Sequence, residues 1–152
     1  MSLSDFTASI KGDAITPSHP NYPSSIARWA KNAERNARVV VFVKDTADVA
    51  QAISYARANE LPIAIRGGGH NAAGTSSVED GLVVDLSKYL NGVRVDEEKR
   101  LAYVGGGAKW RDVDEEAIKY GLATVGGRVN DTGVAGSVLC VKPSTVPLLK
   151  FL

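Results

Sequence analysis

The chain has 152 residues, of which 44% are apolar and 23% charged, so it is long enough to bury a hydrophobic core as one domain. The net charge of +1 gives no indication of a nucleic-acid partner or an anionic-membrane partner. No apolar run approaches the length of a membrane span, and the first residues have neither a basic n-region nor an apolar h-region. The single cysteine excludes an intrachain disulfide, and we expect a cytoplasmic protein by default.

The first 35 residues predict short helical and turn segments. Ser4 is a candidate N-cap for a first helix, and Gly12 is a candidate stop. Residues 16–23 are rich in proline and polar residues, which predicts turns and no regular element. One or two helical turns are expected over residues 24–32.

A strand, a helix and a second strand are predicted next. Residues 39–43 form a continuous β-branched run, which is typical of a strand buried on both faces. Asp45 or Thr46 can cap the following helix, which Asn59 ends. The apolar residues of this helix share one face: Val49, Ala52, Ile53 and Ala56. Residues 63–65 predict a short buried strand, and a βαβ unit places its two strands parallel.

A glycine-rich loop, residues 66–75, follows this strand. Glycines in series leave backbone N–H groups accessible to a ligand, and successive N–H groups in such a turn form a concave anion site. His70 ends the run of three glycines and is placed to act on whatever the loop binds. The alternative is a plain tight turn with a solvated histidine. Because ligands of open α/β sheets bind at the carboxyl ends of strands, we favour a phosphate or pyrophosphate site.

Other motif classes fit the loop poorly. No Walker A lysine follows the glycines, and no Gly-x-Gly-x-x-Gly opens a helix. No Gly-x-Ser-x-Gly nucleophile elbow occurs in the chain. The two histidines are far apart in the sequence and the single cysteine has no partner, so we predict no metal site.

The second half of the chain predicts antiparallel pairing. Residues 82–85 form a third strand, and residues 93–96 and 101–104 alternate in polarity as the two strands of a hairpin. The glycines at 105–107 lead into a helix that Gly121 ends. The apolar residues of that helix share one face: Trp110, Val113, Ala117 and Ile118. Its acidic residues are interpreted as a solvated face: Asp112, Asp114, Glu115 and Glu116.

A third segment dense in small residues runs from 122 to 136. Such a segment permits the close approach of a large flat ligand, and the alternative is a surface loop. The change from parallel to antiparallel pairing predicts two subdomains with a cleft between them.

The segment Arg66-Gly67-Gly68-Gly69-His70-Asn71 resembles the flavin-attachment motif of FAD-linked oxidases in the vanillyl-alcohol oxidase superfamily, berberine-bridge-enzyme-like branch. The similarity runs from about residue 22 to residue 139, with three separate segments in the same order. It implies that the loop binds the FAD pyrophosphate and that His70 is bonded to the 8α-methyl carbon of the flavin. The FAD contacts that the resemblance implies are Arg66, Gly67, Gly68, Gly69, His70, Asn71, Gly74, Thr75, Gly126, Gly127, Thr132, Gly133 and Gly136.

The resemblance also implies an activity. Enzymes of this family take a hydride from a C–H or C–OH group of a small-molecule substrate and pass the electrons to O2. Some relatives form a second flavin bond through a cysteine, and Val129 occupies the corresponding position here. The resemblance therefore implies one covalent bond, through His70. Secreted relatives exist, and no catalytic residue is assigned.

The expected fold is α+β with an α/β-like start. A PCMH-type FAD-binding domain would have a parallel βαβ sheet with helices, followed by an antiparallel sheet. We divide the chain into a lead-in at 1–35, an incomplete FAD-binding domain at 36–139 and a divergent tail at 140–152. Relatives continue with glycines where this chain has residues 140–152, which predicts a C-terminal truncation. The alternative function is a non-catalytic fragment or mis-spliced product that binds FAD weakly or not at all.

Overall fold

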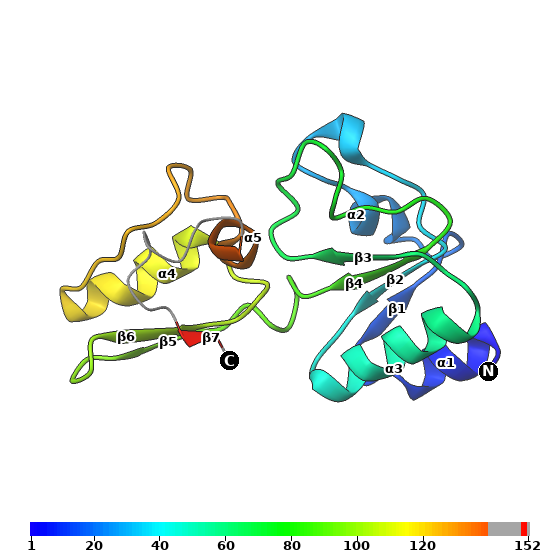
Figure 1. Cartoon of the computed structure of the whole chain (residues 1–152), viewed down its shortest axis with the longest axis horizontal. Coiled ribbons are helices and arrows are strands. Elements are labelled where there is room, and N and C mark those ends of the chain that lie inside the picture. Colours follow the sequence, from blue (N-terminus) through cyan, green and yellow to red (C-terminus); the bar gives the residue numbers. More distant parts are fainter. Residues whose placement is uncertain (140–149, 152) are drawn as a thin grey trace.

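The computed structural model describes residues 1–139 and the backbone of residues 150–151, so most of the tail predicted at 140–152 lies outside the described residues. The described residues form two lobes, each with its own sheet (Figure 1). We call residues 1–88 the N-lobe and residues 93–139 the C-lobe. The fold confirms the predicted α+β class, with a largely parallel sheet followed by an antiparallel hairpin. No helix of the described residues is long and apolar enough to cross a membrane.

The N-lobe contains a four-stranded sheet with the strand order β1-β2-β4-β3. Strands β2, β4 and β3 are parallel, and β1 pairs with β2 in the antiparallel sense. The elements in chain order are α1 (Leu3–Ser9), β1 (Asp13–Ile15), α2 (Tyr22–Ile26), a 3-10 turn (Lys31–Ala33), β2 (Val39–Phe42), α3 (Thr46–Ala58), β3 (Ile63–Arg66) and β4 (Leu82–Asp85).

Both faces of this sheet are covered, and the central strands β2 and β4 are buried along almost their whole length (Figure 1). Helices α1 and α3 pack on one face, where Phe6 and Tyr55 stack with ring centroids 4.1 Å apart. Helix α2 covers the other face through Tyr22, against Val40 and Val83. The β-branched run at 39–43 is therefore buried on both faces, as predicted.

Strand β3 corrects the prediction of a buried strand. Its side chains Ile63 and Ile65 are 39% and 63% exposed, and only Ala64 is buried. The physical reason is the strand order: β4 lies between β2 and β3, which leaves β3 at the edge of the sheet. The two strands of the βαβ unit are parallel but not neighbours.

Helix α3 begins at the predicted cap. The Asp45 Oδ1 accepts hydrogen bonds from the N–H groups of Ala47 (2.9 Å) and Asp48 (3.0 Å). The fully buried Asp48 carboxylate accepts from the N–H groups of Lys11 (2.9 Å), Gly12 (3.0 Å) and Lys44 (2.9 Å). This carboxylate therefore ties the start of β1 and the end of β2 to α3.

Four details of the first 60 residues differ from the prediction. The N-cap of α1 is Ser2 rather than Ser4, because its Oγ accepts from the N–H of Asp5 at 3.1 Å. Helix α2 begins at Tyr22, inside the segment predicted as turns, and β1 was not predicted. On α3, Ile53 is 40% exposed, while Tyr55 is buried in its place.

The C-lobe packs helix α4 on the predicted hairpin. Its elements are β5 (Val93–Asp96), β6 (Leu101–Val104), α4 (Trp110–Ala117), a 3-10 turn (Ile118–Tyr120) and α5 (Val134–Leu139), with β7 (Lys150–Phe151) parallel to β6. Trp110, Val113 and Ala117 are buried as predicted. Ile118 is 70% exposed, because the chain tightens into the 3-10 turn and leaves the apolar face of α4. Gly121 adopts a left-handed conformation and ends this turn, as predicted.

Candidate functional site

The glycine-rich loop leaves the carboxyl end of β3 and makes two sharp turns. Gly69 is buried with φ = +67°, and Gly74 has φ = +83°. Residues with a Cβ rarely adopt these two backbone conformations. Between them, the Asn71 Oδ1 accepts from the N–H of Ala73 at 2.8 Å. Asn71 therefore shapes the turn that follows His70. Thr75 is exposed at the end of the loop.

The first part of this loop carries a run of available donors. None of the N–H groups from Gly67 to Ala72 donates to a backbone carbonyl of residues 1–139. Backbone N–H groups in folded proteins are almost always paired with protein or water, so these donors are available to water or to a ligand. A concave series of N–H groups suits the oxygens of a phosphate or pyrophosphate.

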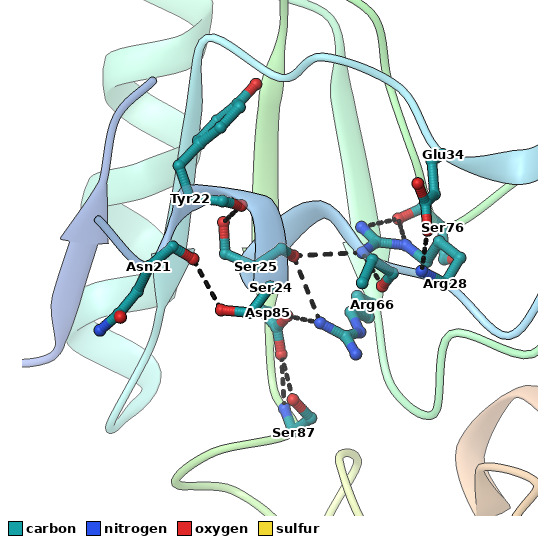
Figure 2. Close-up of polar contacts among 11 residues, drawn as sticks. Asn21, Tyr22, Ser24, Ser25, Arg28, Glu34, Arg66, Ser76, Asp85 and Ser87 are labelled. Carbon is teal, nitrogen blue, oxygen red and sulfur yellow. Dashed lines mark hydrogen bonds and ion pairs between the residues drawn. The ribbon is translucent and has the colours of Figure 1, made fainter. Parts of the chain in front are cut away.

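Two arginines and one aspartate lie under the loop (Figure 2). The Arg66 Nη1 donates to the Asp85 Oδ2 at 2.9 Å, and Asp85 is fully buried. Asp85 also accepts from the Ser87 N–H (2.8 Å) and the Ser87 Oγ (2.6 Å). Arg66, predicted as a pyrophosphate contact, therefore has a structural partner in the next strand.

The second arginine, Arg28, is buried and forms no ion pair within the described residues, and the Glu34 carboxylate accepts from its backbone N–H at 3.4 Å. Its guanidinium donates to the carbonyls of Ser76 (2.8 and 3.2 Å), Ser25 (3.2 Å) and Ala27 (2.8 Å) (Figure 2). Burial, followed by repulsion from Arg66, lowers the pKa of Arg28 to about 10, so the group stays charged at neutral pH.

Charges of both signs lie beside the loop. The guanidinium groups of Arg28 and Arg66 are accompanied by the carboxylates of Asp85 and Glu34. A Cβ on Gly69 would lie 3.0 Å from the Arg66 Nε and 3.2 Å from the Arg28 Cδ. The Arg66 Nε is buried without a hydrogen-bond partner in the described residues. The two arginine side chains that lie against Gly69 would favour an anion on the loop, and the two carboxylates offset part of their charge.

The loop touches the C-lobe through glycine backbones. A Cβ on Gly68 would lie 2.4 Å from the N and 2.6 Å from the Cα of Gly133. A Cβ on Gly67 would lie 2.8 Å from the carbonyl oxygen of Gly106. The structure thus brings glycines from three glycine-rich segments together at the boundary between the lobes.

The rest of the third segment packs on helix α4. Gly133 forms an antiparallel bridge with Lys109, and the backbone N–H of Trp110 donates to the Thr132 carbonyl at 3.0 Å. Gly126 and Gly127 lie against the Trp110 indole, where an added Cβ would approach to 3.0 and 2.6 Å.

Two further members of the predicted set lie within or beside this segment. The Thr132 hydroxyl donates to the Val129 carbonyl. Gly136 is exposed on α5, a helix that was not predicted. The backbone of Thr132 lies beside the loop, because its carbonyl carbon would be 3.4 Å from a Cβ on Gly68, whereas an added Cβ on Gly136 meets no atom within 4 Å.

His70 lies at the end of the donor run, and its ring is half-buried. The Nε2 atom is buried without a hydrogen-bond partner in the described residues. The imidazole stacks on the Trp29 indole with centroids 4.3 Å apart and planes at 19°. The free N–H donors and the two arginine side chains beside Gly69 fit an anionic cofactor, and His70 belongs to the same loop.

Sequence reasoning missed Arg28, Trp29 and Asp85 as parts of this region. It also missed a cavity of about 330 Å³ at the same end of the sheet, beside the Arg66 side chain. In its lining, the Lys88 Nζ donates to the Asp13 carboxylate at 2.6 Å. No short motif marks these residues, because their contacts join segments far apart in the chain.

Comparisons with known proteins agree with this geometry. The family described as FAD binding domain matches residues 37–140. The chain is similar to (R)-6-hydroxynicotine oxidase of Paenarthrobacter nicotinovorans, with 32% identity over 86% of this chain and 28% of the relative. It is also similar to an FAD-linked oxidoreductase of Bacillus subtilis, with 32% identity over 86% of this chain and 29% of the relative.

Solved structures give the same result. The crystal structure of 6-hydroxy-D-nicotine oxidase from Arthrobacter nicotinovorans superimposes with a TM-score of 0.80 at 32% identity, over 83% of this chain and 28% of that one. A Physcomitrella patens BBE-like 1 protein superimposes with a TM-score of 0.83 at 22% identity, over 91% of this chain and 30% of that one, and shows the shared fold.

These matches identify both the fold and the family of the chain. The fold is that of a PCMH-type FAD-binding domain. The chain belongs to the FAD-binding domain family of FAD-linked oxidases, which confirms the resemblance seen in residues 66–71. It spans less than a third of the length of the relatives named above.

Proposed function

We propose that this chain is the FAD-binding portion of an FAD-dependent oxidoreductase of the oxidase type, with the flavin bonded covalently to His70. The observation that carries the proposal is the run of N–H groups from Gly67 to Ala72, which have no backbone acceptor in residues 1–139 and which belong to the same loop as His70. Bound FAD would supply the hydride acceptor for a C–H or C–OH group of a small-molecule substrate, with O2 as the final electron acceptor.

Each part of the site has a role in this proposal. The loop N–H groups donate to the pyrophosphate oxygens, and the charges of Arg28 and Arg66 favour the anion. The close packing of Gly68 on Gly133 keeps the two lobes in register along the cofactor. The His70 imidazole provides the nitrogen that bonds to the flavin 8α carbon. Gly126, Gly127, Thr132, Gly133 and Gly136 remain proposed contacts of FAD.

The experiment that tests this proposal compares the two histidines of the chain. The protein is saturated with FAD, precipitated with acid, and the absorption spectra of pellet and supernatant are recorded. We expect the yellow colour in the pellet for the wild type and for His19→Ala, and in the supernatant for His70→Ala. Pellet-bound flavin in His70→Ala contradicts the anchor assignment.

A second candidate function is a non-catalytic fragment that binds FAD weakly or not at all. Fluorescence titration with FAD separates the two candidates. Saturable binding that a Gly69→Ala substitution weakens supports the FAD site, because Gly69 is buried with positive φ. A folded chain that binds no FAD supports the fragment.

A further inference from the structure

Trp29 is 64% exposed, yet its indole makes a defined aromatic contact. One face of its indole stacks on the His70 imidazole, with ring centroids 4.3 Å apart and planes at 19°. Aromatic pairs prefer such offset-stacked or edge-to-face arrangements, which add stability beyond the burial of surface. A side chain held in this way on the surface has a role other than filling the core.

Hydrogen bonds of Trp29 and of the residue before it connect this segment to the glycine-rich loop and to the residue that follows the loop. Its own N–H donates to the Gly69 carbonyl at 3.2 Å, one residue before His70. The preceding residue, Arg28, is buried and bonded to the Ser76 carbonyl at 2.8 Å, beyond the other end of the loop. The indole is therefore fixed relative to the loop, not only to the histidine.

No hydrogen bond fixes the orientation of the His70 ring within the described residues. A histidine that uses one ring nitrogen for a ligand is commonly oriented by a hydrogen bond on the other. The His70 Nε2 is buried and has no partner in the described residues. The stack on Trp29 is the contact that defines the plane of the imidazole.

We propose that Trp29 is a positioning residue for His70. Its indole fixes the plane of the imidazole at the end of the glycine loop and covers one face of the ring. Trp29 does not contact the reacting atoms. The consequence for flavin attachment rests on the proposed function, whereas the positioning itself is a property of the chain without cofactor.

The positioning is tested by chemical modification of the chain without FAD. Diethyl pyrocarbonate modifies both histidines, and mass spectrometry gives the rate at His70 relative to the exposed His19. We expect Trp29→Ala to raise this ratio about 2- to 10-fold, the factor to which a stack of about 0.5–1.5 kcal/mol corresponds. Trp29→Phe should restore most of the protection. Tyr120→Ala, another exposed aromatic, should leave the ratio unchanged.

An unchanged ratio in Trp29→Ala, with circular dichroism showing a native fold, overturns the positioning role. Because Trp29 is largely exposed, its replacement should leave the hydrophobic clusters on both faces of the N-lobe sheet intact. The result does not depend on FAD, so it stands even if His70→Ala keeps its flavin and the proposed function fails.

A second measurement separates positioning from direct contact with FAD. We expect Trp29→Ala to slow covalent flavin attachment about 2- to 10-fold by the same stacking estimate. In a His70→Ala background, where attachment cannot occur through that residue, Trp29→Ala should leave the Kd for FAD unchanged. If Trp29→Ala weakens FAD binding in this background by the same factor by which it slows attachment, then Trp29 binds the cofactor itself. That result contradicts the proposal.

Discussion

The contact between Gly68 and Gly133 is the most sensitive point of the boundary between the lobes. In Gly68→Ala, the new Cβ would lie 2.4 Å from the Gly133 N, whereas ordinary contacts begin at 3.4 Å. Both partners are backbone, so no side-chain rotation relieves the overlap. One segment must move by about 1 Å, and overpacking of this kind costs about 1–3 kcal/mol.

Urea unfolding of wild type and variants measures this cost as a change in the free energy of unfolding. The matched control is Gly92→Ala, where an added Cβ meets no atom within 4 Å. We expect Gly68→Ala to lower the free energy of unfolding by about 1–3 kcal/mol and the control to change it by less than about 0.5 kcal/mol. Equal stabilities of the two variants refute the close approach of the loops.

The reciprocal substitution, Gly133→Ala, gives a further check. Its Cβ would lie 2.5 Å from the Gly68 N, so both substitutions disturb the same contact. Once the segments are separated by one methyl group, the second costs less. We therefore expect the double variant to be more stable than the sum of the single effects indicates.

Three other predictions concern carboxylates. Asp85→Asn leaves the Arg66 guanidinium beside a neutral group, and we expect urea unfolding to show a loss of about 3 kcal/mol. Asp48→Asn keeps one of the two oxygens that accept backbone N–H groups and should cost about 1–3 kcal/mol in the same assay. A hydrogen bond from Lys88, and then one from Tyr89, holds the pKa of Asp13 below its ordinary value of 3.8. Its contribution to stability is therefore present above pH 3.8 and is lost as the pH falls below that value, so Asp13→Asn should flatten part of the acid decline in the urea midpoint.

The parts of the fold that were predicted correctly depend on local patterns. The β-branched run at 39–43 identifies a buried strand, and Asp45 caps α3 through hydrogen bonds within its own turn. The prediction for β3 was wrong because its apolar residues fit a buried strand and an edge strand equally well. The insertion of β4 between β2 and β3 decides the outcome, and that order is a tertiary property.

Helix α5 shows a different reason for failure. It lies in a glycine-rich segment whose local propensity for helix is low. Contacts with the C-lobe support its first turn: the Val134 N–H donates to the Ala108 carbonyl at 2.9 Å, and Val134 is buried in the core of this lobe. Tertiary packing here overrides intrinsic preference.

The candidate site divides in the same way. The glycine run and His70 form a contiguous motif, so the sequence alone predicted the loop as an anion site. Arg28 and Asp85 belong to the site through contacts with segments far away in the chain, and neither lies in a recognisable pattern. The stack of Trp29 on His70 likewise depends on the folded arrangement.

The glycine contact between the lobes also sets an order of folding events. Each lobe has its own core, and the hairpin and helix α4 of the C-lobe are close together in sequence. Residues 68 and 133, in contrast, meet only after a long loop closes, which carries an entropic cost before any contact is made. We therefore expect the lobes to form first and to dock afterwards. Substitutions at Gly68 should accelerate unfolding and leave the refolding rate nearly unchanged, because the last contacts to form are the first to be released.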